Sequence, residues 1–357
     1  MDFLEQIKRN NATHVVDKEE LKELVFQANK IFKENHSNDV WFERSVFINW
    51  TCGIADCKYC YLSTVPKLKK DAVRSMTSIL AEALICREME WKIGYITGGL
   101  RVETNEYLID LVENIQKITK YQIMMNFGPY HENIIKKFKP HVVGMGSAIE
   151  SFDEELHNFI CPSKPLKSLM KFLEDLKNNH MQKLITIILG LGDKKEHVDI
   201  VIENIKKYNI EKIQLCFLKP QENTLFSEVP SPHPEYMAWW IARIRIACPE
   251  VIIKIALVRD RIEDLSLYLN AGANCFSRFM VFDDFNTSYA KQLEQECKKA
   301  GRNLLGNFTS LPELNVEQLV SDLPFENDMK KQILPKTKQY YEKLKKKMKN
   351  PLTVIKM

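Results

Sequence analysis

Residues 45–61 read SVFINWTCGIADCKYCY and combine an apolar run with a cysteine-rich segment. The run Val46–Trp50 predicts a buried β-strand. Directly after it comes a loop that holds Cys52, Cys57 and Cys60. Four residues separate the first two cysteines and two separate the last two, so the sequence places three thiols on one short loop after a strand.

Three thiolates at this spacing can bind three irons of a cubane [4Fe–4S] cluster and leave the fourth iron open to an exchangeable ligand. The main alternative is a structural zinc site, in which four Cys or His ligands surround the metal. Such a site would normally show a second Cys/His pair at close spacing, and none follows in this sequence. The spacing favours the cluster, while a zinc site and three unrelated thiols remain the alternatives.

Composition and charge limit the class of protein. The chain has 357 residues, of which 45% are hydrophobic and 27% charged, which suits a large globular core. The net charge of +4 is too small to indicate a nucleic-acid partner by itself. No apolar run reaches the length of a membrane span. Nine cysteines without a secretion signal favour a reducing compartment, so we expect a cytoplasmic protein with no membrane partner.

Eight apolar strand candidates alternate with helical segments along most of the chain. In order they are Val46–Trp50, Ile93–Ile96, Tyr121–Met125, His141–Met145, Leu184–Leu189, Ile213–Leu218, Ile252–Val258 and Ala273–Phe276. Apolar, β-branched runs are typical of parallel strands buried on both faces, and regular alternation with helices predicts a parallel sheet with right-handed crossovers. We therefore predict an α/β fold, a (βα)8-type parallel barrel with its chemistry at the carboxyl ends of the strands.

Helical segments are predicted on both sides of the barrel. Residues 1–44 form an N-terminal helical extension, residues 45–285 the barrel, and residues 286–357 a mostly helical C-terminal extension. Within the last of these, residues 336–349 carry seven lysines against one glutamate. We interpret this run as a solvated helix face, with RNA or membrane contact as the less favoured interpretation.

The cysteine loop follows a strand and has Tyr59 just before its third cysteine, and in both respects it resembles the radical S-adenosylmethionine (SAM) superfamily. The resemblance covers residues 20–280. It implies an enzyme in which Cys52, Cys57 and Cys60 hold a [4Fe–4S] cluster and SAM binds the open iron. One electron then cleaves SAM to a 5′-deoxyadenosyl radical that acts on a small molecule, so a reducing electron-donor protein is an expected partner. The superfamily usually has three residues between its first two cysteines, whereas this chain has four.

The resemblance also assigns SAM contacts at the first two strand ends. Tyr59 corresponds to an aromatic residue that packs beside the adenine, with plain loop packing as the alternative. Gly98 and Gly99 follow the second strand and correspond to glycines whose backbone oxygens face the SAM amine, since glycine permits a close approach. Leu100 replaces the glutamate that often follows, so this contact would rest on the backbone alone.

Further SAM contacts are implied after the fourth and fifth strands. Glu150 corresponds to an acceptor for the SAM ribose or amine. Lys164 corresponds to a partner of the SAM carboxylate, a favourable charge-assisted pair. Gly190 corresponds to a glycine that packs against the adenine. For Glu150 and Lys164 the alternative is an ordinary surface role.

Two features narrow the resemblance within the superfamily. The helical N-terminus and the step Ala271–Asn274 are similar to the biotin synthase-like branch. Phe47–Trp50 and Tyr61–Thr64 most resemble the HcgA/HmdB family, which acts in biosynthesis of the guanylylpyridinol cofactor of [Fe]-hydrogenase in methanogens. That family's loop has one more residue between its first two cysteines. The resemblance implies a step toward the pyridinol ring. A carbon-skeleton mutase of the same branch is the alternative enzyme, and a zinc-stabilised RNA-binding module is the alternative from another class.

Arginines follow the last strand candidates and indicate the kind of substrate. Arg259 and Arg261 follow the seventh strand, and Arg278 follows the eighth. Guanidinium groups at a barrel mouth suit a carboxylate or phosphate on the substrate. Surface salt bridges among Arg259, Asp260 and Asp264 are the alternative.

Overall fold

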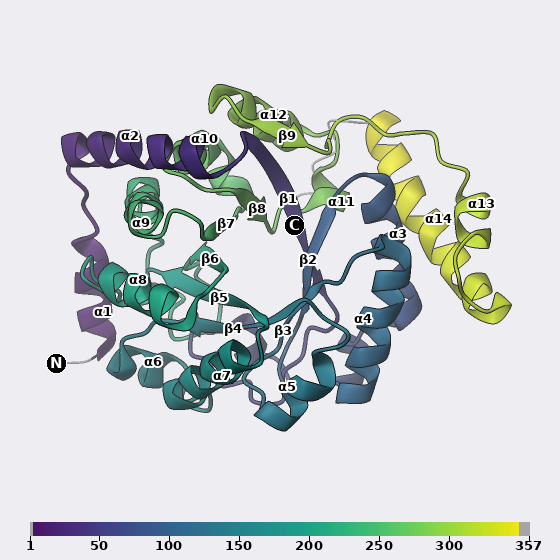
Figure 1. Ribbon diagram of the computed structural model, residues 1–357, viewed down its shortest axis with the longest axis horizontal. Helices are drawn as coiled ribbons and strands as arrows, with labels where there is room; N and C mark the ends of the chain where they lie inside the picture. The colour runs from purple at the N-terminus through teal and green to yellow at the C-terminus, as the bar shows by residue number, and fades with distance from the viewer. Residues whose placement is uncertain (1–2, 350–357) are drawn as a thin grey trace.

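The centre of the molecule is a closed ring of parallel strands surrounded by helices (Figure 1). The structure is a computed structural model that describes residues 3–349. The ring closes because β1 pairs with β2 along one part of its length and with β8 along another. The predicted (βα)8-type barrel is confirmed.

The barrel strands are β1 (Asp39–Phe47), β2 (Lys92–Thr97), β3 (Met124–Asn126), β4 (Gly144–Glu150), β5 (Gln182–Leu189), β6 (Lys212–Phe217), β7 (Ile252–Ala256) and β8 (Cys275–Ser277). The helices between them are α3 (Met76–Glu88), α4 (Asn105–Thr119), α5 (Glu132–Phe138), α6 (Glu154–Ile160), α7 (Leu166–Asn178), α8 (His197–Tyr208), α9 (Pro234–Ala247) and α10 (Leu265–Asn270).

Several strand boundaries differ from the prediction. β1 runs over Asp39–Phe47 rather than Val46–Trp50, because its charged Glu43 and Arg44 find partners on distant strands and on α3 and therefore leave no local apolar pattern. β4 extends to Glu150, so the segment expected after the fourth strand forms its end. The short strand β9 (Asn303–Leu305) was not predicted and pairs with the start of β1.

The N-terminal helices contact different parts of the barrel. Asp17 caps α2 (Lys18–Asn35) by accepting hydrogen bonds from two backbone N–H groups of its first turn, and α2 packs on α9. The first helix, α1 (Phe3–Ala12), lies over the loops after β4, β5 and β6, where Ile7 joins an apolar cluster with Ile160 and Phe226. The predicted helices are confirmed as far as Asn35, whereas residues 39–44, expected within the helical extension, belong to β1. The side chain of Asn11 bonds to the carbonyl of Gly190 after β5, so α1 lies at the carboxyl end of the strands.

The C-terminal region adds α11 (Val281–Asp284), α12 (Ser288–Lys299), α13 (Val316–Ser321) and α14 (Asn327–Lys349). In Figure 1, α14 lies along the outer side of α3. Its buried face includes Ile333, Tyr341 and Leu344, whereas most of its lysines are exposed, as expected for a solvated helix face. Within residues 3–349, no helix combines the length and apolar character needed to cross a membrane.

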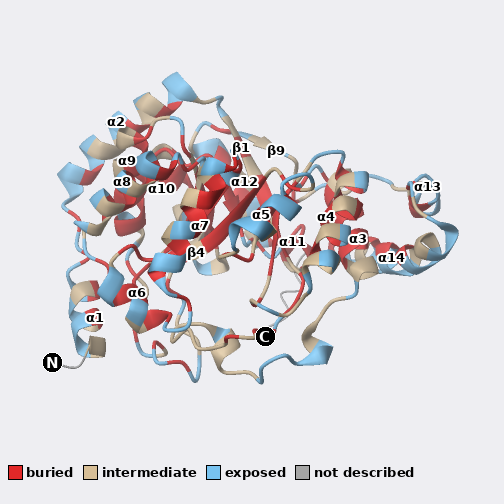
Figure 2. Ribbon diagram, turned by 60° about the horizontal axis from the view of Figure 1, so that its bottom comes forward, coloured by how far each residue is buried: buried red, intermediate tan, exposed pale blue. Residues whose placement is uncertain are grey.

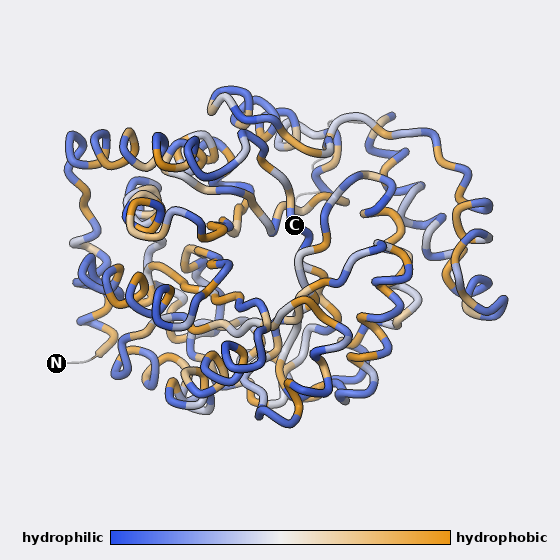
Figure 3. The backbone as a smooth tube through the Cα atoms, viewed as in Figure 1, coloured by the Kyte–Doolittle hydropathy of each residue, from blue (hydrophilic) through white to orange (hydrophobic). Residues whose placement is uncertain are grey.

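Buried residues concentrate on the strands and on the helix faces turned toward them (Figure 2). The same segments are the most hydrophobic parts of the chain, while the outer helix faces are hydrophilic (Figure 3). The main apolar core therefore fills the layer between the strands and the surrounding helices.

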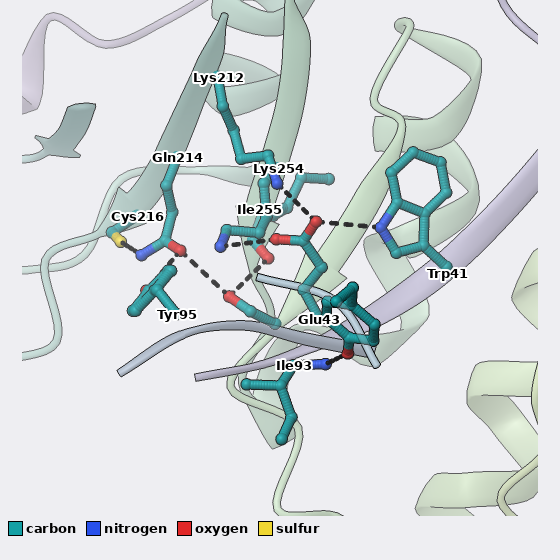
Figure 4. A network of polar contacts seen from close by, with 11 residues as sticks. Trp41, Glu43, Ile93, Tyr95, Lys212, Gln214, Cys216, Lys254 and Ile255 are labelled. Atoms are coloured by element: carbon teal, nitrogen blue, oxygen red, sulfur yellow. Dashed lines mark hydrogen bonds and ion pairs between the residues drawn. The ribbon is translucent and has the colours of Figure 1, made fainter. Parts of the chain in front are cut away.

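The interior of the barrel, in contrast, holds a buried ionic cluster (Figure 4). Glu43 of β1 accepts hydrogen bonds from Lys254 of β7 at 3.0 Å and Lys212 of β6 at 2.6 Å. Burial opposes the charged form of Glu43, yet the two ammonium groups hold its pKa well below the usual range. Because Lys212 is the first residue of β6, this base cluster of Glu43, Lys212 and Lys254 lies toward the amino ends of the strands.

Candidate active site

The cysteine loop lies at the carboxyl end of the barrel. It follows β1, and Ile48 N–H bonds to the carbonyl of Thr97, the last residue of β2. Gly53 N–H bonds to Leu100 O at 2.8 Å, and Lys58 N–H bonds to Ile160 O at 2.9 Å. The loop is thus attached both to the segment after β2 and to the end of α6, across the mouth of the barrel.

Cys52 is held where backbone N–H groups point at its sulfur. Leu100 N–H donates to Cys52 Sγ at 3.3 Å, and Ala55 N–H donates at 3.5 Å. Hydrogen bonds of this kind stabilise a thiolate and are one way in which proteins tune iron–sulfur clusters. The surroundings of Cys52 therefore suit a metal-bound thiolate.

Gly98 and Gly99 let the segment after β2 lie directly on the cysteine loop. A Cβ added at Gly99 would lie 1.7 Å from Thr51 O, and one at Gly98 would lie 2.7 Å from the side chain of Asn49. The same Asn49 accepts a hydrogen bond from Gly99 N–H at 2.7 Å. The two glycines thus have a packing role that the sequence did not reveal, and their contact with SAM stays a prediction.

Cys57 has a neighbouring thiol from outside the cysteine loop. The buried thiol of Cys161 hydrogen-bonds to Cys57 and lowers its pKa, against the opposite effect of burial. Cys60, whose N–H bonds to Cys57 O, has its pKa raised to about 11, first of all by burial. The nearness of Cys161 could not be inferred from sequence spacing, because α6 brings it to the loop.

No three His, Cys, Asp or Glu side chains within residues 3–349 converge closely enough to bind a single metal ion. The ligands of one zinc ion must surround that ion at bonding distance. The thiolates of a cubane cluster bind separate irons and therefore stand further apart. Within residues 3–349, the cysteine loop thus shows no grouping of donors as tight as a zinc ion needs.

Tyr59, Glu150 and Lys164, three of the predicted SAM-binding residues, come together in the structure. Tyr59 O–H donates to Glu150 Oε1 at 2.6 Å. Lys164 Nζ donates to both oxygens of Glu150 at 2.8 Å and to Ala148 O at 2.7 Å. These contacts use the three donors of the ammonium group, so Lys164 positions Glu150 directly, while its contact with the SAM carboxylate stays a prediction.

The backbone at Glu150 is unusual. Its φ is +60°, in the left-handed region that a non-glycine residue rarely adopts, and the pairing of β4 with β5 is irregular at this point. The side chain is only 2% exposed. His157, bonded to Ile149 O and Lys164 O at 2.7 Å each, ties the strand end to the Lys164 segment. Strain of this kind persists only where the surroundings hold it, and it often marks a functional site.

Gly190 directly follows β5 and has a φ of +99°. Its carbonyl accepts a hydrogen bond from the Asn11 side chain of α1 at 2.7 Å, and its N–H bonds to Asp193 at 2.6 Å. A Cβ at this position would lie 2.7 Å from Pro232. Gly190 therefore lies between α1 and the loop before α9, and its predicted contact with adenine stays untested.

The three arginines near the strand ends have different surroundings. Arg259 forms an ion pair with Asp284 at 2.7 Å, rather than with Asp260 as considered from the sequence. Arg261 bonds to Pro232 O at 2.9 Å and lies 3.8 Å from Asp264.

Arg278 is exposed, has a φ of +64°, and forms no hydrogen bond or ion pair with any part of residues 3–349. Burial raises the pKa of the nearby Cys216 thiol, and the Arg278 charge acts to lower it. Within the described residues, Arg278 is therefore a cation without a partner, and it lies near Cys216 at the carboxyl end of β6.

Comparison with known proteins decides the family. A family model described as the radical SAM superfamily matches residues 52–205, a range that starts at the first cysteine of the loop. The chain belongs to the radical SAM superfamily. An uncharacterized protein of Methanocaldococcus jannaschii is 31% identical over 318 residues, which is 87% of each chain. A biotin synthase of Methanococcus maripaludis is 24% identical over 225 residues, 60% of this chain and 68% of the relative.

Two solved structures share the fold of this radical SAM enzyme. Methylornithine synthase (PylB) has a TM-score of 0.62 at 18% identity and covers 76% of this chain and 82% of its own. The FeFe-hydrogenase maturase HydG from Carboxydothermus hydrogenoformans has a TM-score of 0.65 at 15% identity, and the match covers 98% of this chain and 92% of HydG. At these identities the likeness concerns the fold alone. Membership of the superfamily implies a [4Fe–4S] cluster and SAM as cofactors.

Proposed function

We propose that this radical SAM enzyme holds its cluster through Cys52, Cys57 and Cys60 and uses SAM to act on an anionic small molecule. The observation that carries the proposal is the attachment of the cysteine loop across the carboxyl end of the barrel, where barrel enzymes place their chemistry. When bound, the cluster and SAM supply a 5′-deoxyadenosyl radical. The chain's own residues then have to hold SAM, position the substrate and keep the mouth closed to water.

In this proposal Glu150 is the main polar contact for SAM, either at the ribose or at the amine. Tyr59 and Lys164 hold its carboxylate in place, and a carboxylate has further acceptor sites beyond those they occupy. Gly98 and Gly99 supply backbone groups beside the loop, and Gly190 supplies a surface for the adenine. Burial of the Glu150 cluster strengthens these contacts, because a hydrogen bond is electrostatically stronger away from water.

The substrate is proposed to carry a carboxylate or phosphate. Arg259 and Arg261 already have partners within the chain, whereas Arg278 is exposed and has no partner among residues 3–349, so it can bind such a group. Its left-handed backbone supports this role, because a strained residue at a barrel mouth is a common feature of ligand contacts. A guanidinium group binds planar anions through two parallel hydrogen bonds.

The proposed pathway is the biosynthesis of the pyridinol of the [Fe]-hydrogenase cofactor. This finer assignment rests on the similarity of Phe47–Trp50 and Tyr61–Thr64 to the HcgA/HmdB family. The M. jannaschii relative fits a methanogen context, although its own role is uncharacterized. A cytoplasmic location and the division into a barrel at residues 45–285 with two extensions belong to the same proposal.

The test begins with anaerobic reconstitution of the full chain with iron and sulfide. We expect a brown protein that, once reduced with dithionite, converts SAM to 5′-deoxyadenosine and methionine. Iron-loaded protein that leaves SAM intact with every substrate mixture would overturn the proposal. A colourless protein that binds zinc and RNA would support the binding-module alternative.

A second experiment addresses the substrate. The reduced enzyme is incubated with SAM and the small-molecule fraction of a methanogen, and products are followed by mass and ultraviolet absorption. Formation of an absorbing pyridinol precursor would support the cofactor pathway. A product with the same mass as its substrate would instead indicate a carbon-skeleton mutase, because a mutase only rearranges atoms.

A further inference from the structure

The chain just beyond the third cysteine exposes large apolar side chains to solvent. Tyr61 is 52% exposed and Leu68 is 56% exposed, and Trp50, just before the first cysteine, is 48% exposed. Apolar groups scattered singly over a surface need no explanation, but a group of them on one loop often marks an interaction site. These three side chains all belong to the chain segments that flank the cysteines.

The same loop carries an excess of positive charge. Lys67, Lys69 and Lys70 surround Leu68 in the sequence and are all exposed. Their one acidic neighbour on the loop is Asp71, which lies 3.3 Å from Lys69. Residues 66–72, here called the lysine loop, thus present an apolar tip among cations.

Hydrogen bonds join the lysine loop to the residues next to Cys52. Thr51 Oγ1 donates to Pro66 O at 3.2 Å and accepts from Lys69 N–H at 3.0 Å, while Trp50 N–H donates to Ala72 O at 2.8 Å. Thr51 is bonded directly to Cys52. A molecule bound to the lysine loop would therefore lie close to the cysteines.

The backbone at Leu68 supports a role for its side chain. Its φ is +53°, a left-handed conformation in which glycine or asparagine would be less strained. Leucine at this position keeps an apolar group exposed at the loop tip despite the strain. Retained strain of this kind is typical of contact sites.

We propose that the lysine loop, with Tyr61 and Trp50, is the docking surface for an acidic one-electron carrier protein of the flavodoxin or ferredoxin type. The inference rests on the proposed function, in which each SAM cleavage consumes one electron. The carrier is oxidised by one electron and the bound cluster is reduced by one. Complementary charge guides the encounter, and the apolar tip supplies a small contact of the kind seen in transient redox complexes.

Single-stranded RNA is the competing partner, because lysines with nearby aromatic rings also suit nucleotides. The position of the loop favours the carrier. An electron has to reach the cysteines from outside, and the lysine loop is exposed and hydrogen-bonded to the residue beside Cys52. The whole chain has a net charge of only +4, which gives RNA little general attraction.

The experiment compares K67E/K69E/K70E with the matched control K136E/K137E/K139E, which reverses three exposed charges at the far end of α5. The probe is a flavodoxin reduced by its NADPH-dependent reductase, and cluster reduction is followed by the loss of visible absorbance. With the carrier, reduction of the lysine-loop variant should be about tenfold or more slower at low salt, since steering raises encounter rates by that order. Added salt should lower the rate of cluster reduction in the wild-type protein until it approaches that of the variant.

Dithionite separates this inference from the proposed function. It needs no docking surface, so wild type, variant and control should cleave SAM equally well with it. Equal rates for the variant and the control with flavodoxin would overturn the docking surface while leaving the enzyme assignment intact. Failure of all proteins with dithionite would instead overturn the proposed function.

Two measurements keep the test independent of enzyme activity. A carbodiimide should cross-link flavodoxin carboxylates to Lys67, Lys69 or Lys70, even in protein without its cluster, and cross-links elsewhere alone would contradict the proposal. L68N keeps a residue that tolerates the left-handed backbone and should weaken cross-linking several-fold. Binding of a labelled single-stranded RNA that is lost in K67E/K69E/K70E would assign the loop to RNA and overturn the proposal.

Discussion

The two ends of the barrel each contain a buried carboxylate paired with lysine, but they hold it in different ways. At the base, Glu43 lies within β1, is fully buried, and contacts Lys212 and Lys254, which belong to strands across the barrel interior. At the mouth, Glu150 has a left-handed backbone and contacts Tyr59 and Lys164, both from loops.

The difference indicates separate tasks for the two ends. All members of the base cluster belong to strands of the barrel wall, so it can stabilise the fold without contacting a ligand. At the mouth, the strained Glu150 is held by Tyr59, which belongs to the cysteine loop, and by Lys164, which follows α6. A fold retains such strain where a site needs a specific geometry. Substitutions at the mouth should therefore lower activity, and substitutions at the base should lower the stability of the fold.

The largest expected effect is the loss of the cluster when a cysteine at the mouth, but not one at the base, is replaced by alanine. C52A, C57A and C60A should each lose the bound cluster and, with it, SAM cleavage, because each removes one of three iron ligands. C275A removes a buried thiol of β8 whose surroundings include Glu43. This variant should keep both the cluster and SAM cleavage. Iron and sulfide content after reconstitution, together with 5′-deoxyadenosine release, measures the contrast.

C161A gives a sharper version of this test. Cys161 contacts Cys57 but is not a proposed ligand, so its variant should retain the cluster. Loss of iron from C161A or C275A, or full iron content in C57A, would show that the ligand set is misassigned.

The second comparison uses the same substitution at both ends. E43Q should lower the free energy of unfolding by about 3–5 kcal/mol, since it leaves two lysines without their buried carboxylate. SAM cleavage per folded, iron-loaded molecule should be unchanged. E150Q should instead lower that cleavage rate by about 10- to 100-fold, the usual loss when the polar surroundings of a metal site are altered.

Urea unfolding and dithionite-driven cleavage assays measure the two quantities separately. Equal loss of activity in both variants would mean that the base cluster also serves the reaction. An active E150Q would remove Glu150 from the proposed SAM site.

The sequence predicted the barrel and much of the mouth, but little of the base. Periodic apolar runs reveal parallel strands, and the cysteine spacing is a local signal, so both could be read along the chain. Tyr59, Glu150 and Lys164 were proposed from resemblance, and the structure brings them into contact.

The partners of Glu43, in contrast, lie on β6 and β7, far away in the sequence. The charges of Asp39, Glu43 and Arg44 within β1 made its first half look unlike a strand. Cys161 near Cys57 was missed for the same reason, because pairing between distant segments leaves no local pattern. Local periodicity could not reveal either contact.

The third prediction compares Gly99, which packs against the cysteine loop, with Gly94, which packs against Glu43 at the base. A methyl group in G99A would meet the backbone at Thr51, and one in G94A would lie 2.6 Å from the carboxylate of Glu43. Overpacking of this kind costs about 1–3 kcal/mol, so both variants should unfold at lower urea concentration. Only G99A should also lower iron content, because it displaces the cysteine loop. Reduced iron in G94A, at equal folded fraction, would contradict the separation of the two ends.

The smallest expected effect is a pH dependence of stability at the base. The pKa of Glu43 is lowered in the folded protein because its two lysines outweigh the cost of burial. A lowered pKa means that the stabilisation is fully present above the unfolded pKa, about 4.3 for glutamate, and is lost as the pH falls below it. The stability difference between wild type and E43Q should therefore be constant from pH 7 to about 5. Below the unfolded pKa it should narrow by about 1.4 kcal/mol per pH unit. Urea titrations at several pH values measure this difference, and a gap that widens on acidification would show that the carboxylate of Glu43 is not charged in the folded barrel.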